Sequence, residues 1–166
     1  MDNVELLIEK CREEAVIPSY AHDGDAGMDL YSCADLVVEP GKTVLVPVGI
    51  KLAIPYGYEV QIRPRSGISL KTMLRIPNTP GTIDCGYRDE VNVIIHNASN
   101  PVLCTQDEPY NLDVKGAPHG AYHIRKGDRI AQMVLSKVTY ADFKVVSDVS
   151  EYGSDRGGGF GSSGIQ

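Results

Sequence analysis

The chain has 166 residues, enough for one domain with a substantial core but not for two of ordinary size. Its formal net charge of −6 argues against a protein whose affinity comes from neutralising a nucleic-acid backbone, so any polyanion bound here must be met by a few placed cations. The 17 Gly, the 10 Pro and the absence of Trp favour many turns, and hence many short strands.

The cysteines and the N-terminus indicate the cellular compartment. Cys11, Cys33, Cys85 and Cys104 stand far apart, without a Cys-x-x-Cys pair, so we predict four free thiols. No stretch approaches the length needed to span a bilayer, and Met1 is not followed by a basic segment and an apolar run. We therefore expect a cytoplasmic protein with no membrane partner.

Alternating apolar residues predict strands along most of the chain. Near the start, Val4, Leu6 and Ile8 alternate, which is compatible with a strand or with a short helix. From residue 44 to residue 54 every second residue is apolar, which predicts a half-buried strand with Pro47 at a bend or a sheet edge. The stretches "YEVQIRP" (58–64) and "EVNVII" (90–95) repeat the pattern.

The remaining segments complete an all-β prediction. "YHIRKGDRIAQMVL" (122–135) alternates on both sides of a turn at 126–128, and a helical turn or two is expected from Ser66, a typical N-cap residue. Residues 97–120 lose the alternation and predict a long loop. We expect a jelly-roll-like β-barrel or sandwich over residues 1–152, followed by a flexible Gly-rich C-terminal arm over 153–166.

Two segments between the strands carry polar groups beyond the needs of a turn. In "AGMDLYS" (26–32), Asp29 either caps a turn at the start of a strand or serves a site. In "RPRSGISLK" (63–71), Arg65, Ser66 and Gly67 stand at the start of the predicted helical turn. There they form either an anion site or an ordinary N-cap with a solvated arginine.

Three further segments have the same two readings. In "NTPGTIDCGYRDEVNV" (78–93) the Pro80-Gly81 turn predicts a tight hairpin from Asn78 to Asp84, whose backbone can point at something small and flat. Asp84 is either a site residue or a polar residue on a strand. Gln132, in "KGDRIAQMVL" (126–135), has the same two readings. The closing "RGGGFGSSG" (156–164) is either a plain mobile tail or a ligand-closing arm, since a linker needs no Arg and no Phe.

Taken in order, these five segments resemble the five sequence motifs of the homotrimeric dUTP pyrophosphatases, the dUTPases, and the resemblance covers nearly the whole chain. It implies Mg²⁺-dependent hydrolysis of dUTP to dUMP and pyrophosphate by a homotrimer with shared active sites. In the cell this reaction limits uracil incorporation into DNA and supplies dUMP for dTMP synthesis.

The resemblance also implies a role for individual residues. Asp84 matches the general base that activates the attacking water, Tyr87 the residue packed against the deoxyribose, and Phe160 the aromatic stacked on uracil. Asp29 matches an acid that supports hydrated Mg²⁺ through water. The implied substrate-binding residues are Arg65, Ser66, Gly67, Asn78, Thr82, Ile83, Asp84, Tyr87, Asn92, Gln132, Arg156, Phe160, Gly161, Ser162 and Ser163.

Departures from the family pattern leave alternatives open. Three residues separate Arg156 from Phe160 where the usual pattern has four, and the 97–120 loop is longer than in short family members. This loop is either a passive surface insert or a contact for a regulatory protein partner. The competing functions are a dCTP deaminase of the same fold and a non-catalytic module that senses nucleotides.

Overall fold

The structure of the protein, a computed structural model, describes residues 3–155 and residue 157. Strands make up most of its regular secondary structure, so the all-β prediction is confirmed. The strands are β1 (Leu7–Lys10), β2 (Met28–Tyr31), β3 (Leu36–Val38), β4 (Thr43–Pro47), β5 (Ile50–Ala53), β6 (Tyr58–Arg63), β7 (Leu74–Arg75), β8 (Gly81–Ile83), β9 (Asn92–Asn97), β10 (Tyr110–Asn111), β11 (Tyr122–Ile124) and β12 (Arg129–Lys137). The described helices are α1 (Ser66–Lys71) and the short 3₁₀ turns η1 (Pro101–Leu103) and η2 (Val149–Glu151).

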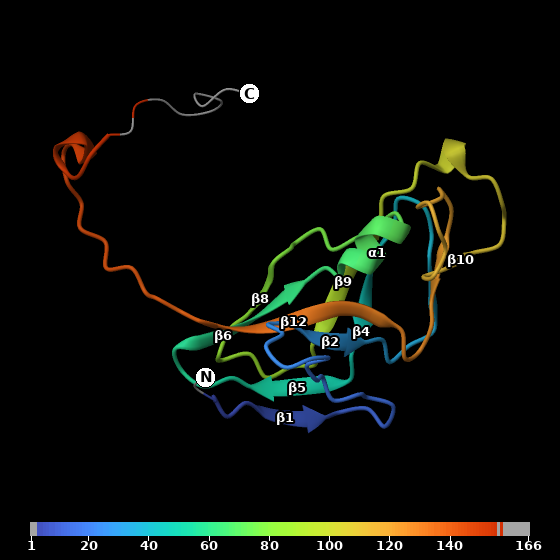
Figure 1. The fold of residues 1–166 in the computed structure, drawn as a ribbon, viewed down its shortest axis with the longest axis horizontal. Helices are drawn as coiled ribbons and strands as arrows, with labels where there is room; N and C mark the ends of the chain where they lie inside the picture. Colours follow the sequence, from blue (N-terminus) through green and yellow to red (C-terminus); the bar gives the residue numbers. More distant parts are fainter. Residues whose placement is uncertain (1–2, 156, 158–166) are drawn as a thin grey trace.

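The strands form small sheets around a common apolar core (Figure 1). The four-stranded sheet has the order β2-β12-β6-β8, and all of its neighbours are antiparallel. The others have the orders β4-β9-β7, β10-β11-β3 and β1-β5. The nine-residue β12 runs between β2 and β6, so it links the first strand of this sheet to its second half.

Burial follows the predicted alternation, with one interruption. The run from 44 to 54 is buried at alternate positions, but it divides into β4 and β5, which belong to different sheets. The break falls at Gly49, whose φ of +72° lies in the left-handed region that glycine adopts without a steric penalty. Pro47 ends β4 at the edge of its sheet, as predicted.

The N-terminal alternation forms a strand and not a helix. β1 pairs antiparallel with β5, and the chain then crosses residues 11–15 toward Gly49, where the Cys11 N–H donates to the Gly49 carbonyl at 2.9 Å. All four cysteines are free, as predicted. Burial raises the pKa of the Cys33 thiol, so this group behaves as a small apolar side chain.

The helical turn is present, but the expected cap is wrong. α1 begins at Ser66, and Arg65 occupies the N-cap position without a side-chain hydrogen bond to the helix. The Arg65 side chain instead turns away toward β2, where a carboxylate holds it. The start of α1 therefore lacks the hydroxyl cap that the sequence predicted.

Segment 97–120, predicted as a long loop, contains regular secondary structure. It includes η1 and the two-residue strand β10, which pairs in parallel with β11. Its base is closed by buried polar groups: the Asn97 Nδ2 donates to the carbonyls of Val38 and Gly120, each at 2.8 Å, and the Ser99 hydroxyl donates to Gly120 at 3.0 Å. The role of this segment toward a partner stays a prediction.

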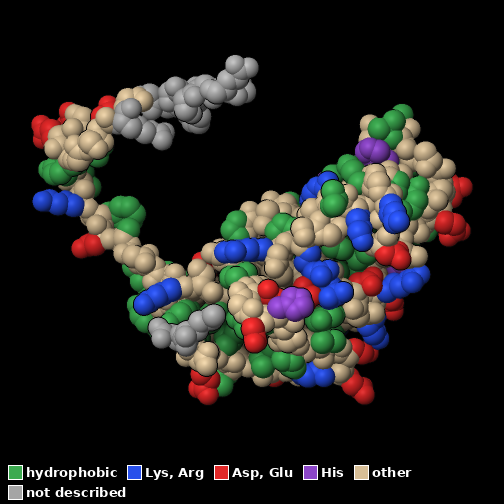
Figure 2. Space-filling model, in the orientation of Figure 1, with side chains coloured by type: hydrophobic (Ala, Val, Ile, Leu, Met, Phe, Trp, Pro, Cys, Tyr) green, Lys and Arg blue, Asp and Glu red, His purple; other side chains and the backbone are tan. Residues whose placement is uncertain are grey.

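After β12 the chain leaves the body (Figure 1). Residues 138–155 run outward, and Figure 2 shows hydrophobic side chains along this segment. Among them, Phe143 and Val145 are 91% and 95% exposed. The predicted boundary between a domain at 1–152 and an arm at 153–166 stays a prediction. Among the described residues, no helix has the length and apolar character that crossing a membrane requires.

Candidate active site

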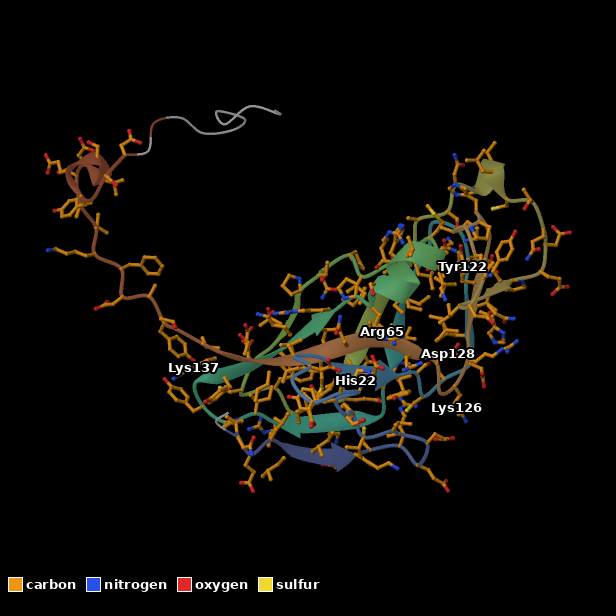
Figure 3. The ribbon with its side chains drawn as sticks, in the orientation of Figure 1. His22, Arg65, Tyr122, Lys126, Asp128 and Lys137 are labelled. Carbon is orange, nitrogen blue, oxygen red and sulfur yellow. The ribbon has the colours of Figure 1, made fainter. Side chains whose placement is uncertain are left out.

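A cavity of about 390 Å³ opens beside β2, β12 and the start of α1. Figure 3 shows Arg65 and His22 on this face, near β2 and β12. The lining residues are Ala21, Asp25, Ala26, Gly27, Asp29, Arg65, Ser66, Gly67, Arg129 and Gln132. The structure therefore brings together five residues that the sequence selected from three separate segments, namely Asp29, Arg65, Ser66, Gly67 and Gln132.

Asp29, in β2, holds two arginines at this cavity. The Arg65 Nε donates to Asp29 Oδ1 at 2.7 Å, and the Arg129 Nη1 donates to Oδ2 at 3.3 Å. The Arg65 Nη1 also donates to the backbone carbonyl of Arg129 at 3.3 Å. Asp25 also lines the cavity, so the two carboxylates balance the two guanidiniums in formal charge, but guanidiniums still bind phosphate oxygens through paired hydrogen bonds. The cluster therefore suits a polyanion.

Gln132 is fixed by its neighbours on both sides. It stands on β12 opposite Asp29 of β2 and Arg63 of β6, and its Nε2 donates to the Pro64 carbonyl at 2.8 Å. Its Oε1 lies over Gly27, where a Cβ atom would stand only 2.2 Å from that oxygen. A residue without a side chain is therefore needed at position 27 for the amide to keep this place.

Arg129 is a cavity residue that the sequence reasoning missed. Residues three apart on a regular strand point to opposite faces, so the positions of Arg129 and Gln132 in β12 do not predict a shared site. The structure has a register shift between Arg129 and Ala131, typical of a β-bulge, where β12 pairs with β2. A bulge re-aims the side chains around it, and here both side chains line one cavity.

A second set of predicted residues lies outside this cavity, around the turn that follows β8. The Asp84 carboxylate is exposed, and its backbone carbonyl accepts a hydrogen bond from the Tyr87 N–H at 3.0 Å. The Tyr87 hydroxyl donates to the Glu90 carbonyl at 3.0 Å, and the Asn92 Nδ2 donates to the same carbonyl at 2.9 Å. This network gives the turn from Asp84 to Asn92 a defined shape.

The hairpin predicted from Asn78 to Asp84 is wrong in its pairing. The chain does turn before β8, but among the described residues the strands on the two sides of the turn do not pair with each other. β7 pairs with β9, and β8 pairs with β6. The physical reason is burial, because Gly81 and Ile83 of β8 face the core beside β6, while Thr82 and Asn78 are exposed.

Within one chain the two sets of residues lie at opposite ends of β6. Ile83 pairs with Val60, so Asp84 follows beside the start of β6, whereas Arg65 comes just after its end. At about 3.3 Å per strand residue, this separates Asp84 from the arginine cavity by roughly 15 to 20 Å. The predicted C-terminal residues Arg156, Phe160, Gly161, Ser162 and Ser163 lie outside the described residues.

Fold and cavity together define an all-β protein with a polar cavity lined by two arginines. A family model described as dUTPase matches residues 13–108. Relatives named deoxyuridine 5'-triphosphate nucleotidohydrolase include one from Clostridium tetani, 41% identical over 99% of this chain and 99% of its own length. Another, from a Picosynechococcus strain, is 41% identical over 96% of this chain and 98% of its own length. The chain belongs to the dUTPase family.

Solved structures agree with this membership. The dUTPase of Staphylococcus bacteriophage 80alpha, determined with dUpNHpp, is 32% identical and superimposes with a TM-score of 0.87 over 98% of this chain and 100% of that chain. The dUTPase from phage phi11 of S. aureus, in a structure that describes a structural Mg(II) ion, is 28% identical, with a TM-score of 0.78 over 88% and 99%. These similarities confirm the predicted jelly-roll-like fold.

Proposed function

We propose that the protein hydrolyses dUTP to dUMP and pyrophosphate. The observation that carries this proposal is the pair of arginines around Asp29, in a cavity that Ser66 and Gly67 also line. In a family whose relatives are named for the hydrolysis of this nucleotide, such a cavity suits the triphosphate. Arg65 and Gln132 would then donate hydrogen bonds to phosphate oxygens.

Asp84 is the proposed general base. A water oxygen forms a bond to the α-phosphorus while the bond from that phosphorus to the bridging oxygen breaks, and the carboxylate takes the proton of the water. Pyrophosphate leaves with the electron pair of the broken bond. The exposure of the carboxylate supports this role, because a water molecule can reach it.

β8 and the turns on either side of it are proposed to select the base and the sugar. Asn78 and the backbone from Thr82 to Asp84 would read the uracil edge, with Ile83 buried beneath them. The Tyr87 ring, held through its hydroxyl, would close the space beside the 2′ carbon and so reject UTP. Asn92 borders the same space.

Mg²⁺ is proposed as the cofactor, held mainly by the substrate. Both carboxylate oxygens of Asp29 accept hydrogen bonds from arginines, and the positive charge of these arginines beside Asp29 disfavours a cation bound directly to it. No group of three or more His, Cys, Asp or Glu residues among those described is arranged to hold a metal. This donor set fits an ion bound by triphosphate oxygens and water, with Asp29 touching it through water only. Bound Mg²⁺ neutralises charge on the phosphates.

We infer a homotrimer with shared active sites. The separation of Asp84 from the arginine cavity supports this inference, since one chain alone does not bring the base to the phosphates. The exposed apolar side chains along residues 138–155 support it as well, because such a segment gains stability by burial against another subunit. Arg156, Phe160, Gly161, Ser162 and Ser163 would close over the nucleotide. The cytoplasm is the proposed location.

The test of the reaction compares pyrophosphate release from dUTP, dCTP, UTP and dTTP with Mg²⁺ present. We expect dUTP to be hydrolysed in clear preference to the other three. Ammonia released from dCTP would indicate a deaminase instead. Nucleotide binding without any product would indicate a non-catalytic module.

The test of the base is Asp84→Asn, with Asp89→Asn as the matched control. Both carboxylates are exposed in the same turn, so the two changes remove the same charge from nearly the same place. We expect Asp84→Asn to lower kcat by roughly 10² to 10⁴-fold while dUTP still binds, as for the loss of a general base. Asp89→Asn should keep the parent's rate. Equal rates in the two variants would remove Asp84 from the mechanism.

A further inference from the structure

One backbone oxygen supports both side chains that flank the proposed sugar site. The Glu90 carbonyl accepts from the Tyr87 hydroxyl at 3.0 Å and from the Asn92 Nδ2 at 2.9 Å. The position of this peptide therefore fixes where the tyrosine ring and the asparagine amide stand. Whatever holds residue 90 also determines the shape of the space between them.

The Glu90 side chain is held at three points. The Arg12 Nε donates to Glu90 Oε1 at 2.5 Å, the Arg12 Nη2 donates to Oε2 at 2.8 Å, and the Gly49 N–H donates to Oε1 at 3.0 Å. The hydrogen bonds from Arg12 hold the pKa of the Glu90 carboxyl below its usual range. The Glu90 side chain is 21% exposed, so this paired, bidentate contact is partly screened from water.

The Arg12 end of the pair is anchored as well. Residues 11–15 lie over Gly49, where an added Cβ would stand 2.6 Å from Cys33 Sγ and 2.7 Å from the Ala15 Cβ. Gly49 also has a positive φ, so two independent constraints favour glycine there. The N-terminal segment thereby brings Arg12 to a fixed place beside residue 90, which is 78 positions away in the sequence.

We propose that Arg12 and Glu90 form a positioning pair that sets the fit of Tyr87 and Asn92 to the substrate's sugar, and so contributes to the choice of dUTP over UTP. This rests on the proposed function. Neither residue touches the substrate in this scheme. Arg12 orients the Glu90 side chain, Glu90 presents its carbonyl, and the carbonyl holds the tyrosine and the asparagine. The pair thus links the N-terminal segment to sugar selection.

A second ion pair in the N-terminal segment serves as a matched control, because it is not connected to residue 90. Glu14, in the same N-terminal segment, accepts from the Lys126 Nζ at 2.9 Å, which ties the segment to the turn before β12. Lys126 and Arg12 have nearly equal side-chain exposure, 44% and 45%. Glu14→Gln therefore loosens the segment without touching residue 90.

The experiment measures kcat and KM for dUTP and UTP in the parent, Arg12→Gln, Arg12→Lys and Glu14→Gln. We expect Arg12→Gln to lower the ratio of kcat/KM for dUTP over UTP by about three- to tenfold, the size typical of residues that act through a neighbour. Most of the change should appear as a higher KM for dUTP. Arg12→Lys should recover part of the ratio, because lysine supplies one contact to the carboxylate in place of two. Glu14→Gln should leave the ratio unchanged.

A double variant keeps the proposal open to refutation. Tyr87→Phe removes the hydroxyl that bonds to the Glu90 carbonyl, so it should lower the ratio as well. Adding Arg12→Gln to it should lower the ratio by less than Arg12→Gln does alone, because only the contact to Asn92 is then left to lose. If Arg12→Gln does not fold, Glu90→Gln replaces it in the double-mutant cycle with Tyr87→Phe, and the same ratio is measured. An unchanged ratio in a folded Arg12 or Glu90 variant overturns the proposal, as does an equal change in Glu14→Gln. A parent that hydrolyses no dUTP would overturn the proposed function itself.

Discussion

The cavity around Asp29 is held together by hydrogen bonds among its own side chains, whereas the turn from Asp84 to Asn92 leaves the Asp84 carboxylate exposed and is held at Glu90 by Arg12 and Gly49 from outside the turn. In the cavity a carboxylate engages two arginines and Gln132 is fixed between Pro64 and Gly27. In the turn the stabilising bonds converge on the Glu90 carbonyl. The cavity lies at the end of β6, whereas the turn starts at Asp84 beside the beginning of β6 and leads into β9 of the β4-β9-β7 sheet.

This difference shows what each region contributes in a single chain. Guanidiniums that are already oriented bind an anion without first being ordered, so under the proposed function we expect the cavity to bind phosphates in one subunit alone. An exposed carboxylate some distance away has no bound phosphorus to act on until another surface reaches it. The comparison therefore predicts that binding and chemistry depend on different numbers of chains.

Among the variants that test this comparison, the largest effect is expected when the cavity loses the Arg65 guanidinium. Arg65→Gln removes the guanidinium that Asp29 holds, and we expect kcat/KM for dUTP to fall by about 10²-fold, as when one preorganised donor to a reacting group is lost. Arg63→Gln is the matched control, because Arg63 lies two residues earlier, bonds to Gln61 and does not line the cavity. Pyrophosphate release measures both. A similar loss in the two variants would mean that general charge, and not the cavity, matters.

The next prediction tests whether the two regions meet between subunits. Arg65→Gln lacks a working cavity and Asp84→Asn lacks the base, so each alone should be nearly inactive. After co-refolding in equal amounts, about one quarter of all sites, or about one third of the sites in mixed trimers, should combine an intact cavity with an intact Asp84 from another chain, restoring roughly a quarter of the parent rate. Native mass spectrometry identifies the mixed trimers. Mixed trimers without recovered activity would place both halves of the site in one chain.

The smallest effect concerns the support of Gln132. Gly27→Ala places a Cβ where the Gln132 Oε1 now lies, and this flexible side chain can move, so we expect about a tenfold loss of kcat/KM and little loss of stability. The same change in a Gln132→Ala background should cost nothing further. Thermal unfolding and pyrophosphate release are measured on all four proteins. Additive losses would show that Gly27 acts through another contact.

Local pattern predicted the strands and the motif residues well. Period-two alternation identified β6 and β9, and the Gly and Pro positions identified the turns, because these signals depend on residues close together in the chain. The cavity residues Asp29, Arg65 and Gln132 came from motif resemblance, and the structure brings them to one place. The hydrogen bonds that hold them, however, from Arg65 to Asp29 and from Gln132 to the Pro64 carbonyl, join positions 36 and 68 residues apart.

The features that the sequence did not predict all depend on pairing between distant segments. Arg129 joins the cavity only because of an irregular register in β12 against β2. The partner of β8 is β6 and not the segment before the turn, since core burial decides the pairing. The contact from Arg12 to Glu90 follows from the passage of residues 11–15 over Gly49, for which no local pattern exists.

Hydrogen bonds close the base of segment 97–120, so the length of this segment has little effect on the rest of the molecule. Asn97 bonds to Gly120, so the two ends are fixed to each other beneath whatever lies between them. Closing a loop of twice the length costs only about 0.6 kcal/mol more. Evolution can therefore insert or delete residues beyond this closure and change the outline of one end of the protein, while Asp29 and Gln132 keep their places in the sheet.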